Sequence, residues 1–214
     1  KRVSGDALPP DAISACGKRV VVIGGGDTGS DCVGTARRHG ADQITQIELL
    51  PEPPAERTVD NPWPEWPVTM RNSSSHEEGC ERIWSVLTES FEGKDRRVQA
   101  LTCAKLKWTR NLDTGKMGFD KIPGSEFKID ADLVLLAAGF LHVENGPLVQ
   151  DFGIDMDERG NIQVDGNLMT AAQGVFSAGD SVLGASLVVR AIDQGRKAAE
   201  GLHRYLETAA SNKP

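Results

Sequence analysis

The most constraining feature of the sequence is a glycine-rich turn that directly follows a run of β-branched residues. Residues 20–23 read Val-Val-Val-Ile, and residues 24–29 read Gly-Gly-Gly-Asp-Thr-Gly. A strand that leads through the spacing GxGxxG into a helix suits a dinucleotide pyrophosphate, because the turn is tight and helix N–H groups point at the phosphates. The predicted nucleotide-binding positions here are Gly24, Gly25, Gly26, Asp27, Thr28 and Gly29.

The residues of the turn have separate expected roles. Gly24 permits the tight turn, Gly26 leaves space for the pyrophosphate, and Gly29 lets the helix pack closely against the strand. Asp27 falls in the first helical turn, where a carboxylate suits the macrodipole but repels phosphate. We expect its side chain to cap the helix and to point away from the phosphates, which leaves the Thr28 hydroxyl free to reach them. Without its context, the spacing also fits an ordinary glycine-rich loop.

The context of the turn favours a βαβ unit. The predicted helix, residues 28–39, ends in a cationic last turn and is followed by Gly40, a typical helix stop. A second predicted strand, residues 44–50, carries Glu48 nineteen residues beyond Gly29. An acid at this distance can hydrogen-bond the ribose 2′-hydroxyl of the nucleotide.

The choice between the two nicotinamide nucleotides depends on three residues. Glu48 favours NADH, because its carboxylate would repel the 2′-phosphate of NADPH. Gly29 points the same way, since NADPH sites often carry alanine at this position. Arg57, the first basic residue after the second strand, is the candidate that could instead contact a 2′-phosphate.

Composition excludes several classes of partner. The 214 residues carry a net charge of −7, which argues against nucleic acid or an anionic membrane surface as the main partner. The longest apolar run, residues 133–141, is much shorter than the roughly 20 residues of a membrane span, so we expect a soluble chain. No signal peptide is recognisable, and the first residue is Lys1, so we expect a piece of a longer protein.

The four cysteines are far apart in the sequence and form no CxxC pair: Cys16, Cys32, Cys80 and Cys103. This spacing provides no local motif for zinc or for an iron–sulfur cluster, so no metal-binding residue is predicted. We expect buried free thiols in a reducing compartment, which favours a cytoplasmic protein.

The middle of the chain is predicted to be irregular at first and then antiparallel. Six prolines and two tryptophans between residues 51 and 71 predict a stiff extended loop, either a lid over the nucleotide or a strap whose tryptophans fill the core. A short helix should follow, with capping boxes from Ser74 to Glu77 and from Ser75 to Glu78. We interpret His76 as an incidental surface histidine.

Strand-like patterns then cover residues 83–91, 97–110 and 117–122, with a hairpin connection at residues 92–95. They predict an antiparallel β-meander. Residues 132–139 form an apolar strand that we expect to be buried on both faces and central in a parallel sheet.

The last third contains a second candidate site. Residues 174–180 predict a short strand that ends in Gly179 and Asp180, and a helix is predicted for residues 186–208. Asp180 could hydrogen-bond a cofactor hydroxyl, and the helix start at Ser186, Leu187 and Val188 would offer its positive dipole end to an electron-rich ring. The alternative is a turn aspartate before an amphipathic core helix, whose inward residues would be Leu187, Ala191, Ile192, Ala198 and Leu202.

Several segments together carry a family resemblance: GGGDTG, ELLPEPPAER, NPWPEWP, SSSHEEGCER, IPGSEF, ADLVLLAAGF and GVFSAGDSVLGASLVVRAIDQGRKAA. In this order they resemble the C-terminal part of the small (β) subunit of glutamate synthase, across nearly the whole chain. Relatives of the same architecture include the flavin domains of dihydropyrimidine dehydrogenase. In such proteins an NAD(P)H domain is inserted into an FAD domain.

The resemblance implies three segments and an α/β fold. Residues 1–17 would be a leading strap, and residues 18–130 a Rossmann-type NAD(P)H-binding domain with an antiparallel β-meander crossover. Residues 131–214 would be the C-terminal half of a second, FAD-type dinucleotide-binding domain. By the family pattern, Asp180 would hold the ribityl or phosphate side of FAD, the helix near Ser186 would face the pyrimidine end of the flavin, and Gly139 would lie near the cofactor crossover.

The implied function is electron transfer by an NAD(P)H-dependent oxidoreductase. Hydride would pass from NADH or NADPH to FAD, and electrons would continue through iron–sulfur clusters to the large subunit, where glutamine and 2-oxoglutarate become two glutamates. No catalytic acid–base residues are expected, because positioning and electrostatics are the protein's share. The first FAD glycine motif and the cysteine-rich cluster region of the family are missing from this sequence, so we expect the fragment alone to bind FAD poorly and to be inactive.

Two alternatives remain open from the sequence. One is the electron-transfer subunit of another NAD(P)H-dependent reductase with the same architecture. The other is a non-catalytic module that senses the nucleotide.

Overall fold

The computed structural model describes residues 9, 12–65, 67–111 and 114–211, and most of the predicted leading strap lies outside this part. The chain divides into two compact units, Lys1–Ala138 and Gly139–Pro214. The predicted boundary at residue 131 assigns the strand of residues 133–136 to the second domain. In the structure this strand pairs with the first strand of the chain, so it belongs to the first unit.

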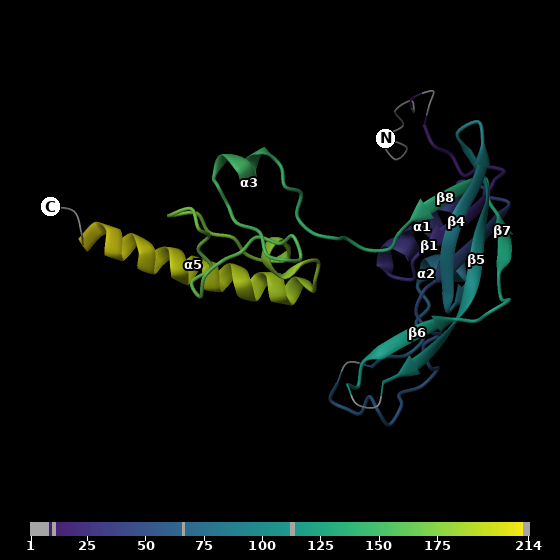
Figure 1. Cartoon of the computed structure of the whole chain (residues 1–214), viewed down its shortest axis with the longest axis horizontal. Helices are drawn as coiled ribbons and strands as arrows, with labels where there is room; N and C mark the ends of the chain where they lie inside the picture. Colours follow the sequence, from purple (N-terminus) through teal and green to yellow (C-terminus); the bar gives the residue numbers. More distant parts are fainter. Residues whose placement is uncertain (1–8, 10–11, 66, 112–113, 212–214) are drawn as a thin grey trace. The chain divides into compact units, whose positions relative to one another are not determined.

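The first unit is organised around a parallel sheet of four strands in the order β3-β2-β1-β8, of which β1 and β8 are labelled in Figure 1. Its members are β1 (Arg19–Ile23), β2 (Gln43–Glu48), β3 (Glu81–Trp84) and β8 (Leu133–Leu136). Strands β1 and β2 are joined by helix α1 (Asp27–Arg38), which confirms the predicted βαβ unit.

Strand β1 is buried on both faces, which explains its continuous β-branched sequence. Because side chains alternate along a strand, Val20 and Val22 pack with Val33 of α1 on one face. On the other face, Val21 packs with Val86 and Leu101 of the antiparallel strands. The sheet therefore lies between α1 and an antiparallel sheet.

The antiparallel sheet confirms the predicted meander but corrects its limits. It contains β4 (Val86–Lys94), β5 (Arg97–Arg110), β6 (Met117–Lys121) and β7 (Phe127–Asp130), and β5 pairs with the other three. The single strand predicted for residues 83–91 is wrong, because Ser85 has a φ of 57° and separates β3 from β4. The hairpin turn lies at Asp95 and Arg96, whose positive φ values are typical of a tight hairpin connection, and not at residues 92–95.

Strand β8 differs from its predicted place in the sheet. It was expected at the centre and buried on both faces, whereas it lies at the end of the strand order and pairs only with β1 among the described strands. Its side chains are half-buried, and Leu136 is 73% exposed. An apolar run therefore indicated the strand correctly but not its position.

The proline-rich segment 51–71 forms no helix or strand in its described residues, as predicted. Trp63 is 83% exposed, so it does not fill the core, and Trp66 lies outside the described residues. The short helix α2 (Ser74–Glu77) is present, but its capping box is formed by Ser73 and His76. The two predicted boxes are wrong, because the helix begins one residue earlier than the first box requires and two residues earlier than the second.

The second unit contains α3 (Pro147–Asp151), α4 (Asp180–Leu183) and the long helix α5 (Val188–Ser211). The strand predicted for residues 174–180 is absent, and only Phe176 forms an isolated bridge, with Met169. A small core forms around Val149, Ile154 and Ile162.

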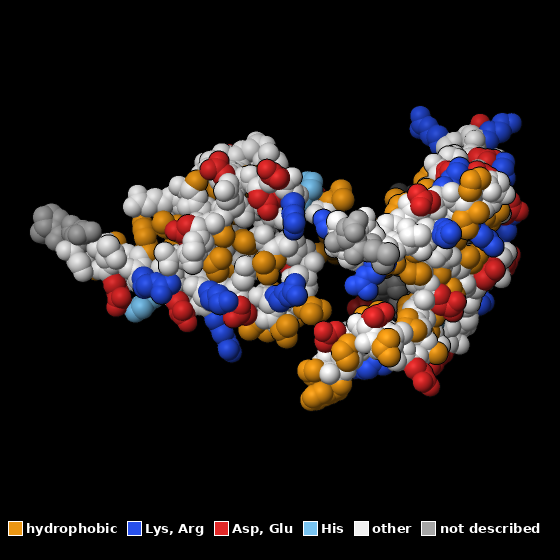
Figure 2. All heavy atoms as spheres, turned by 60° about the horizontal axis from the view of Figure 1, so that its bottom comes forward, with side chains coloured by type: hydrophobic (Ala, Val, Ile, Leu, Met, Phe, Trp, Pro, Cys, Tyr) orange, Lys and Arg blue, Asp and Glu red, His pale blue; other side chains and the backbone are white. Residues whose placement is uncertain are grey.

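Three apolar residues that would face inward under the alternative of an amphipathic core helix are exposed: Leu187 by 66%, Ile192 by 52% and Leu202 by 41%. Figure 2 shows hydrophobic side chains at the surface of this unit. The amphipathic pattern was therefore a poor guide to burial here. No helix in the described part of the chain is long and apolar enough to cross a membrane.

Candidate functional site

The glycine turn after β1 requires glycine at two positions for reasons visible in the structure. Gly24 has a φ of 121°, and a Cβ there would collide with the carbonyl oxygen of Ala137. A Cβ at Gly29 would collide with the carbonyl oxygen of Gly24. The tight turn and the close packing of α1 against it are therefore confirmed.

Gly26 has a different role, because it faces open space. It is the N-cap residue of α1, no side chain caps this helix end, and a Cβ at Gly26 would have no atom within 4 Å. The first N–H groups of a helix have no intrahelical partner and favour an anion. The open side of Gly26 and the uncapped start of the twelve-residue helix thus fit a pyrophosphate.

Asp27 and Thr28 follow at the start of α1, and both are exposed. The expectation that Asp27 caps the helix is wrong, because the N-cap is Gly26 and α1 has no side-chain cap. As the first residue of the helix proper, Asp27 is past the cap position, and its charge there suits the macrodipole.

Glu48 lies beside the turn, as the sequence predicts. Its Oε2 accepts a hydrogen bond from the backbone N–H of Gly25, and its Oε1 accepts one from the N–H of Leu50 at 3.1 Å. A Cβ at Gly25 would meet this carboxylate, so a larger residue here would displace the Glu48 side chain. The register places Trp84 of β3 next to Glu48 at the same edge of the sheet.

A polar network behind the turn was missed by the sequence analysis. Gln46 is 2% exposed, its Nε2 donates to the Gly24 carbonyl at 2.9 Å, and its Oε1 lies 2.9 Å from Nε2 of His76. The Ser73 N–H donates to Nδ1 of His76 at 3.3 Å, and the hydroxyls of Ser73 and Ser30 are hydrogen-bonded. A polar residue at an inward position of an otherwise buried strand was the available signal.

His76 is therefore not an incidental surface histidine. Its ring is half-buried and joins α2 to β2. Burial lowers the pKa of His76 below its ordinary value, and the nearby charge of Arg82 lowers this pKa further. The neutral imidazole is thus the favoured form.

Two basic residues, Arg57 and Arg82, bear on the choice between NADH and NADPH, because a cationic side chain could pair with a 2′-phosphate. Nη1 of Arg57 donates to the carbonyl oxygens of Asn61 at 3.1 Å and Glu65 at 2.8 Å, so its guanidinium is held by its own loop. Arg82 stacks over the Trp84 ring at 4.8 Å from the ring centre, and its Nη1 donates to Oδ1 of Asn72 at 2.9 Å.

The second unit brings three of its predicted residues together. The Gly179 N–H donates to Oε1 of Gln194 at 2.7 Å, and Oδ1 of Asp180 accepts from the N–H of Ser186 at 3.3 Å. Asp180 begins α4, whereas Ser186 precedes α5, so the aspartate ties the two helix starts together.

The remaining predicted residues of this unit lie on open surface. Leu187 and Val188 are 66% and 73% exposed, at the start of α5. Gly139 has a φ of 89° and no atom within 4 Å of a would-be Cβ, and it is the first residue of the second unit. Their exposure leaves them accessible to a cofactor.

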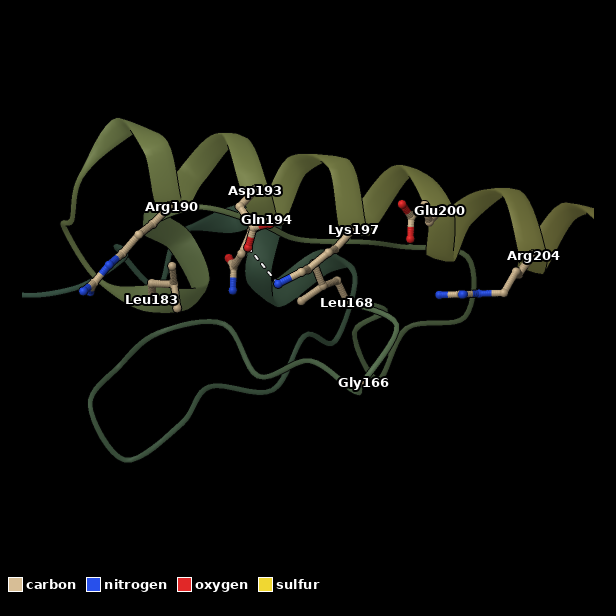
Figure 3. A pocket seen from close by; sticks show the side chains of 9 residues that line it. All are labelled: Gly166, Leu168, Leu183, Arg190, Asp193, Gln194, Lys197, Glu200 and Arg204. Carbon is tan, nitrogen blue, oxygen red and sulfur yellow. Dashed lines mark hydrogen bonds and ion pairs between the residues drawn. The ribbon is translucent and has the colours of Figure 1, made fainter.

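A groove of about 450 Å³ runs along α5 (Figure 3). Its charged residues have mixed signs, and Lys197 forms an ion pair with Asp193 at 2.7 Å. None of the predicted site residues lines this groove, which includes Arg190, Asp193, Lys197, Glu200 and Arg204.

The cysteines are all free thiols, as predicted, but only Cys103 is buried, whereas Cys16 is exposed. Burial raises the pKa of the Cys103 thiol, which keeps it protonated. In the described ranges, no group of three or more histidine, cysteine, aspartate or glutamate residues is arranged to hold a metal ion.

Comparison with known proteins identifies relatives. The glutamate synthase (NADPH) small chain of Mycobacterium tuberculosis H37Rv is 49% identical over 94% of this chain and 40% of that protein. The glutamate synthase (NADH) of Schizosaccharomyces pombe is 44% identical over 87% of this chain and 9% of that protein. The chain therefore spans well under half the length of these curated relatives.

Solved structures share the fold at low sequence identity. Mycobacterium tuberculosis FprA in complex with NADPH has a TM-score of 0.67 at 14% identity, over 92% of this chain and 55% of that chain. Thioredoxin reductase from T. acidophilum has a TM-score of 0.55 at 24% identity, over 91% of this chain and 54% of that chain. Residues 3–195 match the family described as pyridine nucleotide-disulphide oxidoreductase, and the chain belongs to this family.

Proposed function

We propose that this chain is the NAD(P)H-binding part, and one portion of the FAD-binding part, of a glutamate synthase small subunit that passes electrons from NAD(P)H to FAD. The observation that carries this proposal is the glycine turn, which is open at Gly26 and leads into an uncapped helix with Glu48 beside it. The identity with curated small chains supports the choice of this enzyme among the reductases of the family.

The residues of the turn would bind and orient the nicotinamide nucleotide. Backbone N–H groups at the start of α1 would hold the pyrophosphate, and the open side of Gly26 would admit it. Each Glu48 oxygen already accepts one backbone hydrogen bond, and a carboxylate has lone pairs left to accept another from a ribose hydroxyl. The chain's own part is positioning and charge, so no acid–base pair is needed.

The flavin would supply the hydride acceptor when it is bound. Asp180, Gly179 and the helix start at Ser186, Leu187 and Val188 would provide one side of its site, together with Gly139. Asp180 supports this role because it is exposed and fixed by Ser186. A large subunit would receive the electrons, as the small-chain names of the relatives imply. The family resemblance adds iron–sulfur clusters in other parts of the protein as the carriers between FAD and that subunit.

NADH is the nucleotide that the geometry favours. Glu48 lies beside the glycine turn, and if it contacts the ribose as its sequence position predicts, its charge would repel a 2′-phosphate. Arg57, the residue that could offset this repulsion, is engaged by two carbonyl oxygens of its own loop.

An anaerobic absorption spectrum of the full-length protein, recorded before and after addition of NADH and of NADPH, tests the proposed function. Loss of the flavin bands is expected, at a lower concentration of NADH than of NADPH. Nucleotide binding without loss of these bands would instead identify a nucleotide-sensing module. The proposal would be refuted if neither nucleotide bound to the protein and neither bleached the flavin bands. Glutamate formation with the large subunit then separates glutamate synthase from another reductase.

A further inference from the structure

We propose that Gln46 and His76 are positioning residues for nucleotide binding, which fix the orientation of the Gly24–Gly25 peptide so that its carbonyl oxygen points away from the pyrophosphate. This inference rests on the proposed function and deepens it. Neither residue is placed to touch the nucleotide; both act through the backbone of the turn.

The Gly24–Gly25 peptide is held at both of its polar ends by β2. Gln46 Nε2 donates to the Gly24 carbonyl at 2.9 Å, and Glu48 accepts from the Gly25 N–H. Gln46 and Glu48 are two positions apart, so they lie on the same face of the strand. A peptide plane with both ends bonded in this way cannot turn its carbonyl toward the ligand.

The orientation of that carbonyl matters for an anion. A carbonyl oxygen carries partial negative charge and would repel a phosphate that approaches the turn. Gly24 has no Cβ and a φ of 121°, so its own conformational preference does little to prevent rotation. The side chain of Gln46 supplies the restraint that glycine lacks.

His76 determines which end of the Gln46 amide faces the turn. The Ser73 N–H donates to Nδ1 of His76 at 3.3 Å, so Nδ1 is the acceptor and the proton is on Nε2. That Nε2–H then donates to Gln46 Oε1 at 2.9 Å, which leaves the amide NH₂ group for the Gly24 carbonyl. A flipped amide would place two oxygens against each other.

The burial of Gln46 favours one arrangement of this hydrogen-bond network over the alternatives. At 2% exposure, an unsatisfied amide would be costly, so its two partners hold it in one rotamer. Ser73 also caps α2 and is hydrogen-bonded to Ser30 of α1. The cap of α2, strand β2 and the turn after β1 are thus connected by consecutive hydrogen bonds.

The test measures dissociation constants for NADH and NADPH by calorimetry on the full-length protein, together with KM and kcat for reduction of an artificial electron acceptor. Gln46→Leu removes both hydrogen bonds, and we expect Kd and KM to rise about tenfold with kcat within about twofold of wild type. Gln43→Leu is the matched control, since Gln43 is an exposed residue of the same strand, and it should leave Kd unchanged.

His76 is tested by rescue. His76→Phe removes the Nε2–H donor, whereas His76→Gln keeps an amide N–H at a similar reach from the backbone. We expect His76→Phe to raise Kd and His76→Gln to restore most of the affinity. A purely structural role would lower the melting temperature of both variants without separating their affinities.

The outcomes are distinguishable. If wild type and Gln43→Leu bind neither nucleotide, the proposed function fails. If wild type binds but Gln46→Leu binds within about twofold of it, the positioning role is refuted. If Gln46→Leu does not fold, Gln46→Glu takes its place, because the carboxylate can accept from His76 but cannot donate to Gly24. Affinity of Gln46→Glu equal to that of wild type would likewise overturn the inference.

Discussion

Glu48 accepts a hydrogen bond from the backbone N–H of Gly25, which joins the end of β2 to the turn that follows β1. This contact places a carboxylate within the glycine motif itself, at the point where the chain is proposed to hold the ribose of the nucleotide. Its charge and its position can be tested separately, because glutamine has the same shape as glutamate without the charge.

Glu48→Gln should shift the preference between the nucleotides. The amide oxygen can still accept from the Gly25 N–H, so the turn is expected to remain intact, and the amide nitrogen loses only the bond that Glu48 accepts from the Leu50 N–H, outside the turn. Loss of the negative charge removes the repulsion of a 2′-phosphate, and we expect the ratio of the NADPH to the NADH dissociation constant to fall about tenfold. Calorimetric titration with both nucleotides measures this ratio, and an unchanged ratio would show that Glu48 does not face the 2′ position.

Gly26→Ala should separate binding from folding. Gly26 has a φ of −77°, and a Cβ there meets no atom within 4 Å, so we expect the melting temperature to stay within a few degrees of wild type. The added methyl group would occupy the space proposed for the pyrophosphate, and we expect the affinity for NADH to fall at least about tenfold. Equal affinity of variant and wild type would place the phosphates elsewhere.

The first unit was more predictable than the second, for a physical reason. Val20 to Ile23 and the glycines after them specify a buried strand and a tight turn through local rules, and the structure has both. Position within a sheet depends on distant partners, which is why β8 was wrongly expected at its centre. Likewise, no local pattern predicted that Ser85 separates two strands.

In the candidate site too, local sequence predicted some residues, whereas others depend on partners that are distant in the sequence. Glu48 and the motif glycines could be found from spacing alone, whereas the roles of Gln46 and His76 required the pairing of β2 with the turn and with α2. In the second unit, periodicity offered a buried helix face as one of two alternatives, but Ile192 and Leu202 are exposed. Periodicity reports which residues share a face, not whether another element covers it.

His76 should make stability dependent on pH near neutrality. Burial and the charge of Arg82 lower the pKa of His76 below its ordinary value of 6.5, so the unfolded chain binds this proton more readily than the folded one. The contribution of neutral His76 is complete above pH 6.5 and is lost as the pH falls toward the lowered pKa. Urea denaturation of wild type and His76→Gln between pH 5 and 7.5 measures it. A parallel decline in both proteins would assign the effect to other groups.

The pair of Arg19 and Asp132 should also make the stability of the fold depend on pH, in the acid range. Asp132 accepts hydrogen bonds from the Arg19 backbone N–H, from Nε and from Nη2, each at 3.0 Å, which ties the start of β1 to the residue before β8. The hydrogen bonds from Arg19 lower the pKa of Asp132 to about 2, so its contribution is present above pH 3.8 and is lost as the pH falls toward 2.

Asp132→Asn should therefore lower the urea midpoint at pH 7 by a small amount, since the pair is partly exposed and screened by solvent, and should flatten the decline of stability below pH 4. Asp130→Asn is the matched control, because Asp130 makes one contact with Arg19 and its side chain is 69% exposed. If Asp130→Asn flattens the acid profile as much as Asp132→Asn, the backbone and side-chain bonds to Asp132 are not what secures the outer strand β8 to β1.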